Sequence, residues 1–118
     1  MKIKTIYCLK DGSSKFGEME FSFKNGNCSA NTIGTLTSMF PASGICFRET
    51  PADYKFSWHV APHRQFIVNL DAAVEVTTSD GESNIFDNGE IFFVEDIRGT
   101  GHFSKSVDNK KRRYGNCN

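Results

Sequence analysis

The chain has 118 residues, enough for one domain with a substantial core and too few for two. Its 14 basic and 14 acidic side chains cancel, so no global electric field favours a nucleic acid or an anionic membrane as a partner. No segment approaches the roughly 20 consecutive apolar residues that a membrane-spanning helix needs.

The N-terminal segment MKIKTIYCLKDG lacks the apolar run and cleavage site of a secretory signal. The four cysteines show neither a CxxC pair nor zinc-finger spacing; they are Cys8, Cys28, Cys46 and Cys117. We therefore expect free thiols in a reducing cytoplasm, with the first three acting as small buried apolar residues.

Turn-forming dipeptides recur along the chain at Asp11-Gly12, Asn25-Gly26, Asp80-Gly81 and Asn88-Gly89. This pattern predicts an all-β sandwich or barrel. In chain order, alternating residues predict strands over 3–7, 18–23 and 45–48. Residues 24–44, rich in Asn, Ser, Thr and Gly, are expected to form a long loop, which either has a function or hides a further element.

The strongest strand signals lie between residues 65 and 94. Residues 66–70 and 74–78 are rich in β-branched and aromatic side chains. A hairpin turn is predicted at 79–82, a returning strand at 84–86, a second turn at 87–89 and a buried strand at 91–94. We expect these strands to pair in succession as an antiparallel meander.

The end of the chain is basic, with four consecutive cationic residues from Lys110 to Arg113. Such a run is typical of a solvated segment. The predicted organisation is therefore one β domain over residues 1–109 and a basic tail over 110–118.

Two histidines and one amide are the main candidates for a site: His59, Gln65 and His102. Along an extended segment every second side chain faces the same way, so His59, Gln65 and Asn69 are expected on one face. Polar groups inside a small barrel must be paired or bound. Two imidazoles and an amide oxygen suit a divalent ion such as Zn, Fe, Ni or Mn; the alternative is a metal-free pocket with the histidines as acid and base.

Other side chains near these positions have candidate roles. Trp58 can form a flat wall against a ligand. Arg48 and Arg64 can clamp a carboxylate or phosphate, or instead pair with a neighbouring acid. Glu95 is a candidate general base, and Asp96 a candidate ligand-binding group. The Gly99-Thr100-Gly101 segment is expected to be a turn that delivers His102.

The segment from His59 to His102 resembles the two motifs of the cupin superfamily. In the first motif, G(X)5HXH(X)3-4E(X)6G, the two histidine positions fall on His59 and Ala61 and the glutamate position on Gln65. In the second, G(X)5PXG(X)2H(X)3N, Gly89 opens the motif and His102 takes the histidine position. Small single-domain cupins with WHxAPxRQ, SDG and EDxxGxGH signatures look more similar still, over residues 1–107.

The resemblance implies a double-stranded β-helix, the jelly-roll cupin barrel. It also implies a small-molecule site, and we expect an enzyme acting on a compact polar metabolite, of the isomerase, lyase or oxygenase type. The alternative is a cupin that binds or senses a ligand without turnover. Similar cupins close with an apolar strand that this chain lacks under the tail interpretation, so a homodimer is expected to cover the bare sheet edge.

Overall fold

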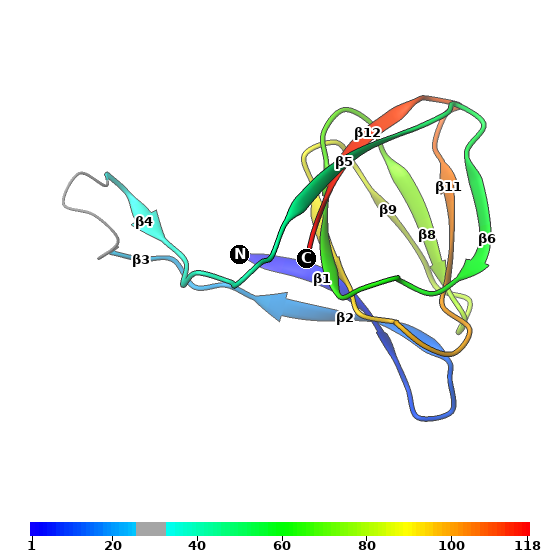
Figure 1. The fold of residues 1–118 in the computed structure, drawn as a ribbon, viewed down its shortest axis with the longest axis horizontal. Coiled ribbons are helices and arrows are strands. Elements are labelled where there is room, and N and C mark those ends of the chain that lie inside the picture. The colour runs from blue at the N-terminus through cyan, green and yellow to red at the C-terminus, as the bar shows by residue number, and fades with distance from the viewer. Residues whose placement is uncertain (26–32) are drawn as a thin grey trace.

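The computed structural model describes residues 1–25 and 33–118, and this part of the chain is built entirely from β-strands (Figure 1). It contains no helix that is long and apolar enough to cross a membrane. The strands are β1 Lys2–Cys8, β2 Ser14–Glu20, β3 Lys24–Asn25, β4 Thr35–Leu36, β5 Ile45–Thr50, β6 Lys55–His59, β7 Gln65–Asn69, β8 Val74–Thr78, β9 Ser83–Phe86, β10 Ile91–Val94, β11 His102–Ser106 and β12 Arg112–Cys117.

Two sheets form the body of the molecule. The larger has the order β2-β1-β10-β7-β12-β5 and the smaller β6-β11-β8-β9. Strands β1 and β10 run parallel, whereas every other recorded strand pair is antiparallel. The core lies between the sheets, where side chains such as Val74 and Val76 of β8 meet Ile67 of β7 and Phe92 of β10. Alternation of buried residues along β7 and β8 places their apolar side chains on this inner face.

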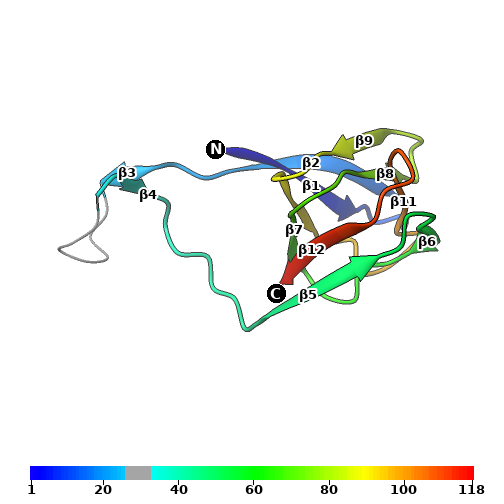
Figure 2. The ribbon, with the colours of Figure 1, turned by 90° about the horizontal axis from the view of Figure 1, so that it is seen from above.

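The β3–β4 pair stands apart from this body and projects from one end of it (Figures 1 and 2). The prediction of one long loop over residues 24–44 therefore missed two short strands. The Asn25-Gly26 turn and Cys28 reach into residues 26–32 and lie outside the described residues.

The predicted meander is wrong, although its strands and turns lie near the expected positions. Among the four strands from β7 to β10, only β8 and β9 pair as a hairpin, whereas β7 pairs with β10 and also with β12. From β5 onward, each connection takes the chain from one sheet to the other, except the turn between β8 and β9, which stays within the smaller sheet. Period-two alternation identifies a strand with one buried face, but it carries no information about which strand lies beside it.

The predicted C-terminal tail is also wrong. Residues Arg112–Cys117 form β12, which lies inside the larger sheet between β7 and β5. Arg112 and Tyr114 are each only 4% exposed. The cationic composition concealed an alternating strand, in which Arg112, Tyr114 and Asn116 share one face. The closing strand is therefore present, and the bare edge that suggested a homodimer does not exist at that place.

Cysteine burial follows the sequence-based expectation only in part. Cys8 and Cys117 are partly buried, whereas Cys46 is exposed on the edge strand β5. All three thiols are free.

Candidate functional site

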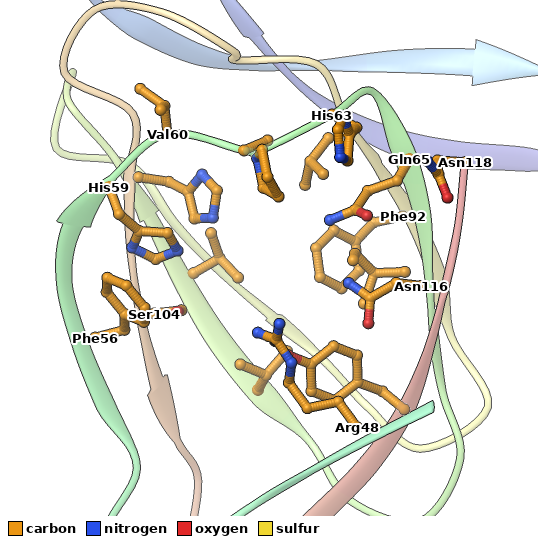
Figure 3. A pocket seen from close by; sticks show the side chains of 18 of the residues that line it. Arg48, Phe56, His59, Val60, His63, Gln65, Phe92, Ser104, Asn116 and Asn118 are labelled. Atoms are coloured by element: carbon orange, nitrogen blue, oxygen red, sulfur yellow. Dashed lines mark hydrogen bonds between the residues drawn. The ribbon is translucent and has the colours of Figure 1, made fainter. Parts of the chain in front are cut away.

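A cavity of about 600 Å³ opens between the two sheets (Figure 3). His59, Gln65 and His102 all line it, so the prediction that these three side chains share one interior space is confirmed. The intervening residues Val60 and Pro62 line it as well, so the expected alternation along one extended segment is wrong. Strand β6 ends at His59 in the smaller sheet and β7 begins at Gln65 in the larger one, so the two side chains reach the cavity from different sheets.

The cavity has two walls of different chemistry. The smaller sheet supplies a histidine wall, defined here as His59 from β6 with His102 and Ser104 from β11. The larger sheet supplies an arginine wall, defined as Arg48 from β5 with Arg112, Tyr114 and Asn116 from β12. No Asp or Glu side chain is among the described residues that line the cavity, so the charged side chains there are those of the two arginines.

His102 is held by a buried carboxylate. Its Nδ1 lies 2.6 Å from Oδ2 of Asp96, and the two residues are 7% and 0% exposed. A carboxylate oxygen only accepts hydrogen bonds, so Nδ1 carries the proton and Nε2 is the nitrogen left for a ligand. Asp96 follows β10 and does not line the cavity. It therefore orients the imidazole, and it would stabilise the ring after His102 gains a second proton.

His59 stands beside His102, with 4.4 Å between the ring centroids. Its Nδ1 donates to the carbonyl oxygen of Ser57 at 2.8 Å, and Phe56 packs against the ring. The pKa of His59 is lowered, first because burial disfavours the charged ring and also because of repulsion from His102. The histidine wall thus contains two rings whose Nδ1 atoms are fixed and whose Nε2 atoms are available.

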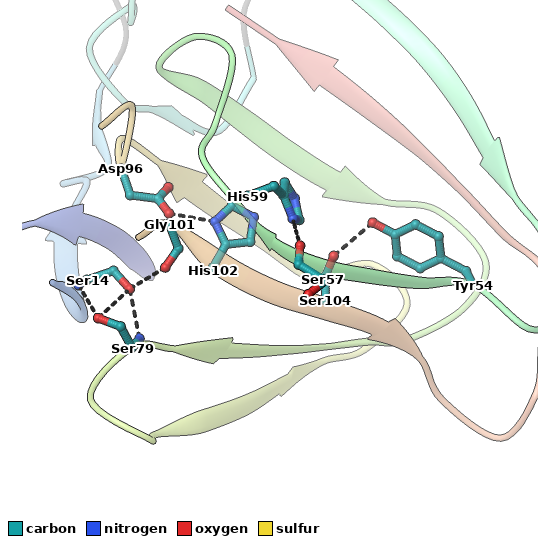
Figure 4. A network of polar contacts seen from close by, with 9 residues as sticks. All are labelled: Ser14, Tyr54, Ser57, His59, Ser79, Asp96, Gly101, His102 and Ser104. Carbon is teal, nitrogen blue, oxygen red and sulfur yellow. Dashed lines mark hydrogen bonds and ion pairs between the residues drawn. The ribbon is translucent and has the colours of Figure 1, made fainter. Parts of the chain in front are cut away.

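The loop before β11 explains how His102 reaches this position (Figure 4). Gly101 has φ of +74°, and a Cβ there would collide with the backbone of His59 and Val60, so only glycine permits this close approach. Ser14 Oγ donates to the Gly101 carbonyl at 2.6 Å, and Ser14 and Ser79 also exchange backbone-to-side-chain bonds. These contacts anchor the expected Gly99-Thr100-Gly101 turn between the N-terminal hairpin and β8.

The arginine wall carries polar atoms that have few partners. Arg48 Nη1 donates to the Tyr114 hydroxyl at 3.3 Å, and the Arg112 guanidinium lies 3.9 Å from the centroid of the Tyr114 ring. Neither arginine has an ion pair among the residues that the structure describes. Burial lowers the pKa of Arg112, and repulsion from Arg48 acts in the same direction.

The donor set fits a resident transition metal poorly. Within residues 1–25 and 33–118, no three His, Cys, Asp or Glu side chains come together as a metal-binding group. His59 and His102 offer two imidazoles, and the remaining candidate, Gln65, offers only a neutral amide oxygen. Sites for such metals usually have at least three protein ligands that include thiolate, imidazole or carboxylate groups.

Several predicted site residues lie away from the cavity. Trp58 is exposed and packs on Phe103, and Arg64 is exposed as well. Neither of them, nor Glu95, is among the lining residues. Asn69 is buried but donates from Nδ2 to the Phe86 carbonyl at 2.9 Å, which gives it a structural partner. Of the two adjacent acids, Asp96 and not Glu95 contacts a candidate catalytic group.

Six further lining residues were not predicted from the sequence: Tyr54, Phe56, Ser104, Arg112, Tyr114 and Asn116. The alternation of Arg112, Tyr114 and Asn116 was a usable signal, but the basic run hid it. Tyr54, in the turn between β5 and β6, hydrogen-bonds to Ser104 of β11 at 2.8 Å, a contact that no local pattern predicts.

Comparison with known proteins adds no further evidence: no family model and no curated protein matches the chain.

Proposed function

We propose that the protein is a small cupin enzyme that performs acid–base chemistry on a compact polar metabolite, of the isomerase or lyase type. The observation that carries this proposal is the buried Asp96–His102 pair beside His59 at a cavity wall. A carboxylate that fixes the tautomer of an imidazole is a common arrangement for a general base.

In the proposed reaction, His102 Nε2 takes a proton from a carbon next to a substrate carbonyl. The electron pair of that C–H bond moves toward the carbonyl oxygen and forms an enolate. Return of the proton to the opposite face of the same carbon gives an epimer. Alternatively, the carbonyl re-forms, a C=C bond forms, and a leaving group departs with its electron pair from the carbon on the far side of the deprotonated one, which gives an elimination product. Asp96 stabilises the imidazolium that exists between the two steps, and His59, whose pKa is lowered, remains a neutral neighbour that does not repel it.

An oxygenase reaction would need a redox centre, and the two imidazoles and one amide described above are a weak set for one. The proposed reaction therefore uses no metal. A divalent metal held by His59, Gln65 and His102 stays a prediction, and elemental analysis of protein purified without chelator tests it. If a metal is present, His102→Ala should remove it.

The cupin assignment is supported by the strand order. Strands β5 to β12 divide into β10-β7-β12-β5 in one sheet and β6-β11-β8-β9 in the other. Four strands in each of two facing sheets, with chain connections that cross between them, are features of a jelly roll. The glycine-rich turn that leads into His102 lies where the resemblance places its second motif.

The test is proton exchange into a panel of small oxo and hydroxy acids, sugars and sugar phosphates in D2O, followed by NMR. We expect a substrate of the enzyme to incorporate deuterium next to its carbonyl, and His102→Gln to slow this by about 10²- to 10⁴-fold. His63→Gln is the matched control, since His63 lines the same cavity but is exposed. Saturable binding of a panel compound with no exchange or turnover across the panel would favour the alternative, a cupin that binds its ligand without turnover.

We also retain a homodimer as a proposal, on different grounds from the sequence-based one. The edge strand β5 exposes Ile45 and Phe47 at 56% and 70%, and an exposed apolar edge strand is a template for pairing with another chain. Light scattering of the wild type and of Phe47→Lys tests this: we expect a dimer that the substitution weakens, whereas a monomeric wild type would contradict it.

A further inference from the structure

Arg112 is a buried charge without a counter-charge. It is 4% exposed, and its Nε and Nη1 have no hydrogen-bond partner among the described residues. The guanidinium packs on the Tyr114 ring, with 3.9 Å between its carbon and the ring centroid. A buried cation that has no ion pair among the described residues and leaves two of its nitrogens without acceptors there is costly to keep, so its position requires an explanation.

The next residue provides an internal comparison. Arg113 is exposed on the opposite face of β12, and its Nε donates to Asp71 Oδ2 at 2.7 Å. The chain thus pairs the arginine that water could solvate and leaves unpaired the one that water reaches least. The burial of Arg112 is therefore not a by-product of a structural ion pair.

We propose that Arg112 and Arg48 form a subsite for one anionic group, a carboxylate or a phosphate, of the ligand. The proposal deepens the proposed function and rests on it for the reaction, while the binding of the anion stands on the cavity alone. Arginine suits this role because its planar donors match the oxygens of both groups.

The charges around the subsite agree with this. Two arginines and three histidines line the cavity, together with no Asp or Glu side chain among the described residues. Arg48 and Arg112 repel one another across Tyr114, and an anion between them would reverse that repulsion. Arg48 is exposed and Arg112 is buried, so the subsite extends from the protein surface into the interior.

The size of the cavity and one further polar atom of the arginine wall restrict the class of ligand that fits. A volume of about 600 Å³ accommodates a compact metabolite. Asn116, on the same face of β12, has an Oδ1 without a partner among the described residues and can accept a hydrogen bond from a hydroxyl. The inferred substrate is therefore a small hydroxylated acid or phosphate ester, bound by its charge at the arginine wall with its carbonyl-bearing carbons toward His102.

Calorimetric titration with inorganic phosphate and, separately, malonate tests the subsite at matched ionic strength. We expect saturable binding of at least one probe to the wild type, and the better probe identifies the anion. Arg112→Met should weaken that binding by about tenfold or more, the usual loss for a charged hydrogen bond. Arg113→Met is the matched control and should leave the affinity unchanged.

Arg48→Met gives a second variant at an exposed position, so the test survives if Arg112→Met does not fold; its binding should also weaken. Binding of neither probe to the wild type, or equal affinities in the folded Arg112 or Arg48 variant and the wild type, would overturn the proposal. His102→Gln separates the two proposals, since it should retain anion binding while losing proton exchange. Wild-type protein that binds the anion but catalyses no proton exchange would reject only the catalytic proposal.

Discussion

The two walls of the cavity differ in how many of their buried polar groups have hydrogen-bond partners among the described residues. On the histidine wall, both Nδ1 atoms have acceptors, from Asp96 and from Ser57, so the rings are fixed before any ligand arrives. On the arginine wall, Arg112 is buried, but two of its three nitrogens lack partners among the described residues. One wall thus holds its imidazoles through hydrogen bonds, while the other has donors without acceptors in the described part of the chain; the two proposals above rest on this difference.

The largest expected effect on stability comes from removing the strand that carries most of the arginine wall. Deleting residues 110–118 takes β12 from between β7 and β5, and loss of the buried Tyr114 ring alone should cost about 3–5 kcal/mol of a total near 5–15 kcal/mol. We expect no cooperative thermal transition. A double Lys110→Ser, Lys111→Ser variant, altered just before the strand, should melt like the wild type; a deletion variant with unchanged melting would mean that β12 is not part of the sheet.

Asp96→Asn tests the histidine wall at the next scale of effect. The substitution keeps the shape of the side chain but removes the charge that stabilises protonated His102, so proton exchange should fall by about 10²-fold or more. The free energy of unfolding should change little. The Oδ1 atom of Asp96 is buried without a partner in the described part of the chain, so removing the negative charge of this side chain also removes a cost of burying it. Urea titration and NMR exchange rates measure the two quantities. Exchange that persists at the wild-type rate would remove Asp96 from the mechanism.

Arg112→Met and Arg113→Met should change the stability of the fold in opposite directions. Without ligand, replacing a buried unpaired guanidinium by an apolar side chain should stabilise the fold by about 1–4 kcal/mol. The same change at Arg113 breaks an exposed ion pair and should destabilise the fold only slightly. Opposite signs at two consecutive residues, read from chemical denaturation, are the expected result. A clear loss of stability in Arg112→Met would indicate that the guanidinium supports the fold itself.

The smallest expected effect concerns pH. The pKa of His59 is lowered in the folded protein, mainly by burial, with repulsion from His102 and Arg48 outweighing attraction to Asp96. Below its ordinary pKa near 6.5, the unfolded chain binds a proton at this position that the folded protein resists, so stability falls as pH drops through this range. Between pH 8 and pH 5, His59→Gln should lose less stability than the wild type. Parallel pH profiles for the two proteins would contradict the shift.

Much of the local structure could be predicted from the amino-acid order. Alternation identified most of the strands, and the glycines at 12, 81 and 89 have the positive φ angles that their predicted turns require. Strands and turns depend on a few neighbouring residues, so a local pattern carries the information. The common cavity for His59, Gln65 and His102 was suggested by the motif resemblance, whereas the alternation assumed between His59 and Gln65 does not exist, because these residues lie on strands of different sheets.

Which strands pair, and what each buried side chain meets, was decided by the tertiary structure. Arg112 and Arg113 have the same chemistry and adjacent positions, yet one lines the cavity and the other binds Asp71 at the surface. Glu95 and Asp96 differ in the same way, since only the second reaches His102. The sequence by itself determined that strands with buried faces would form. The pairing of β12 between β7 and β5 then determined which of its faces is inside, because a sheet buries side chains according to its partners and not according to their charge.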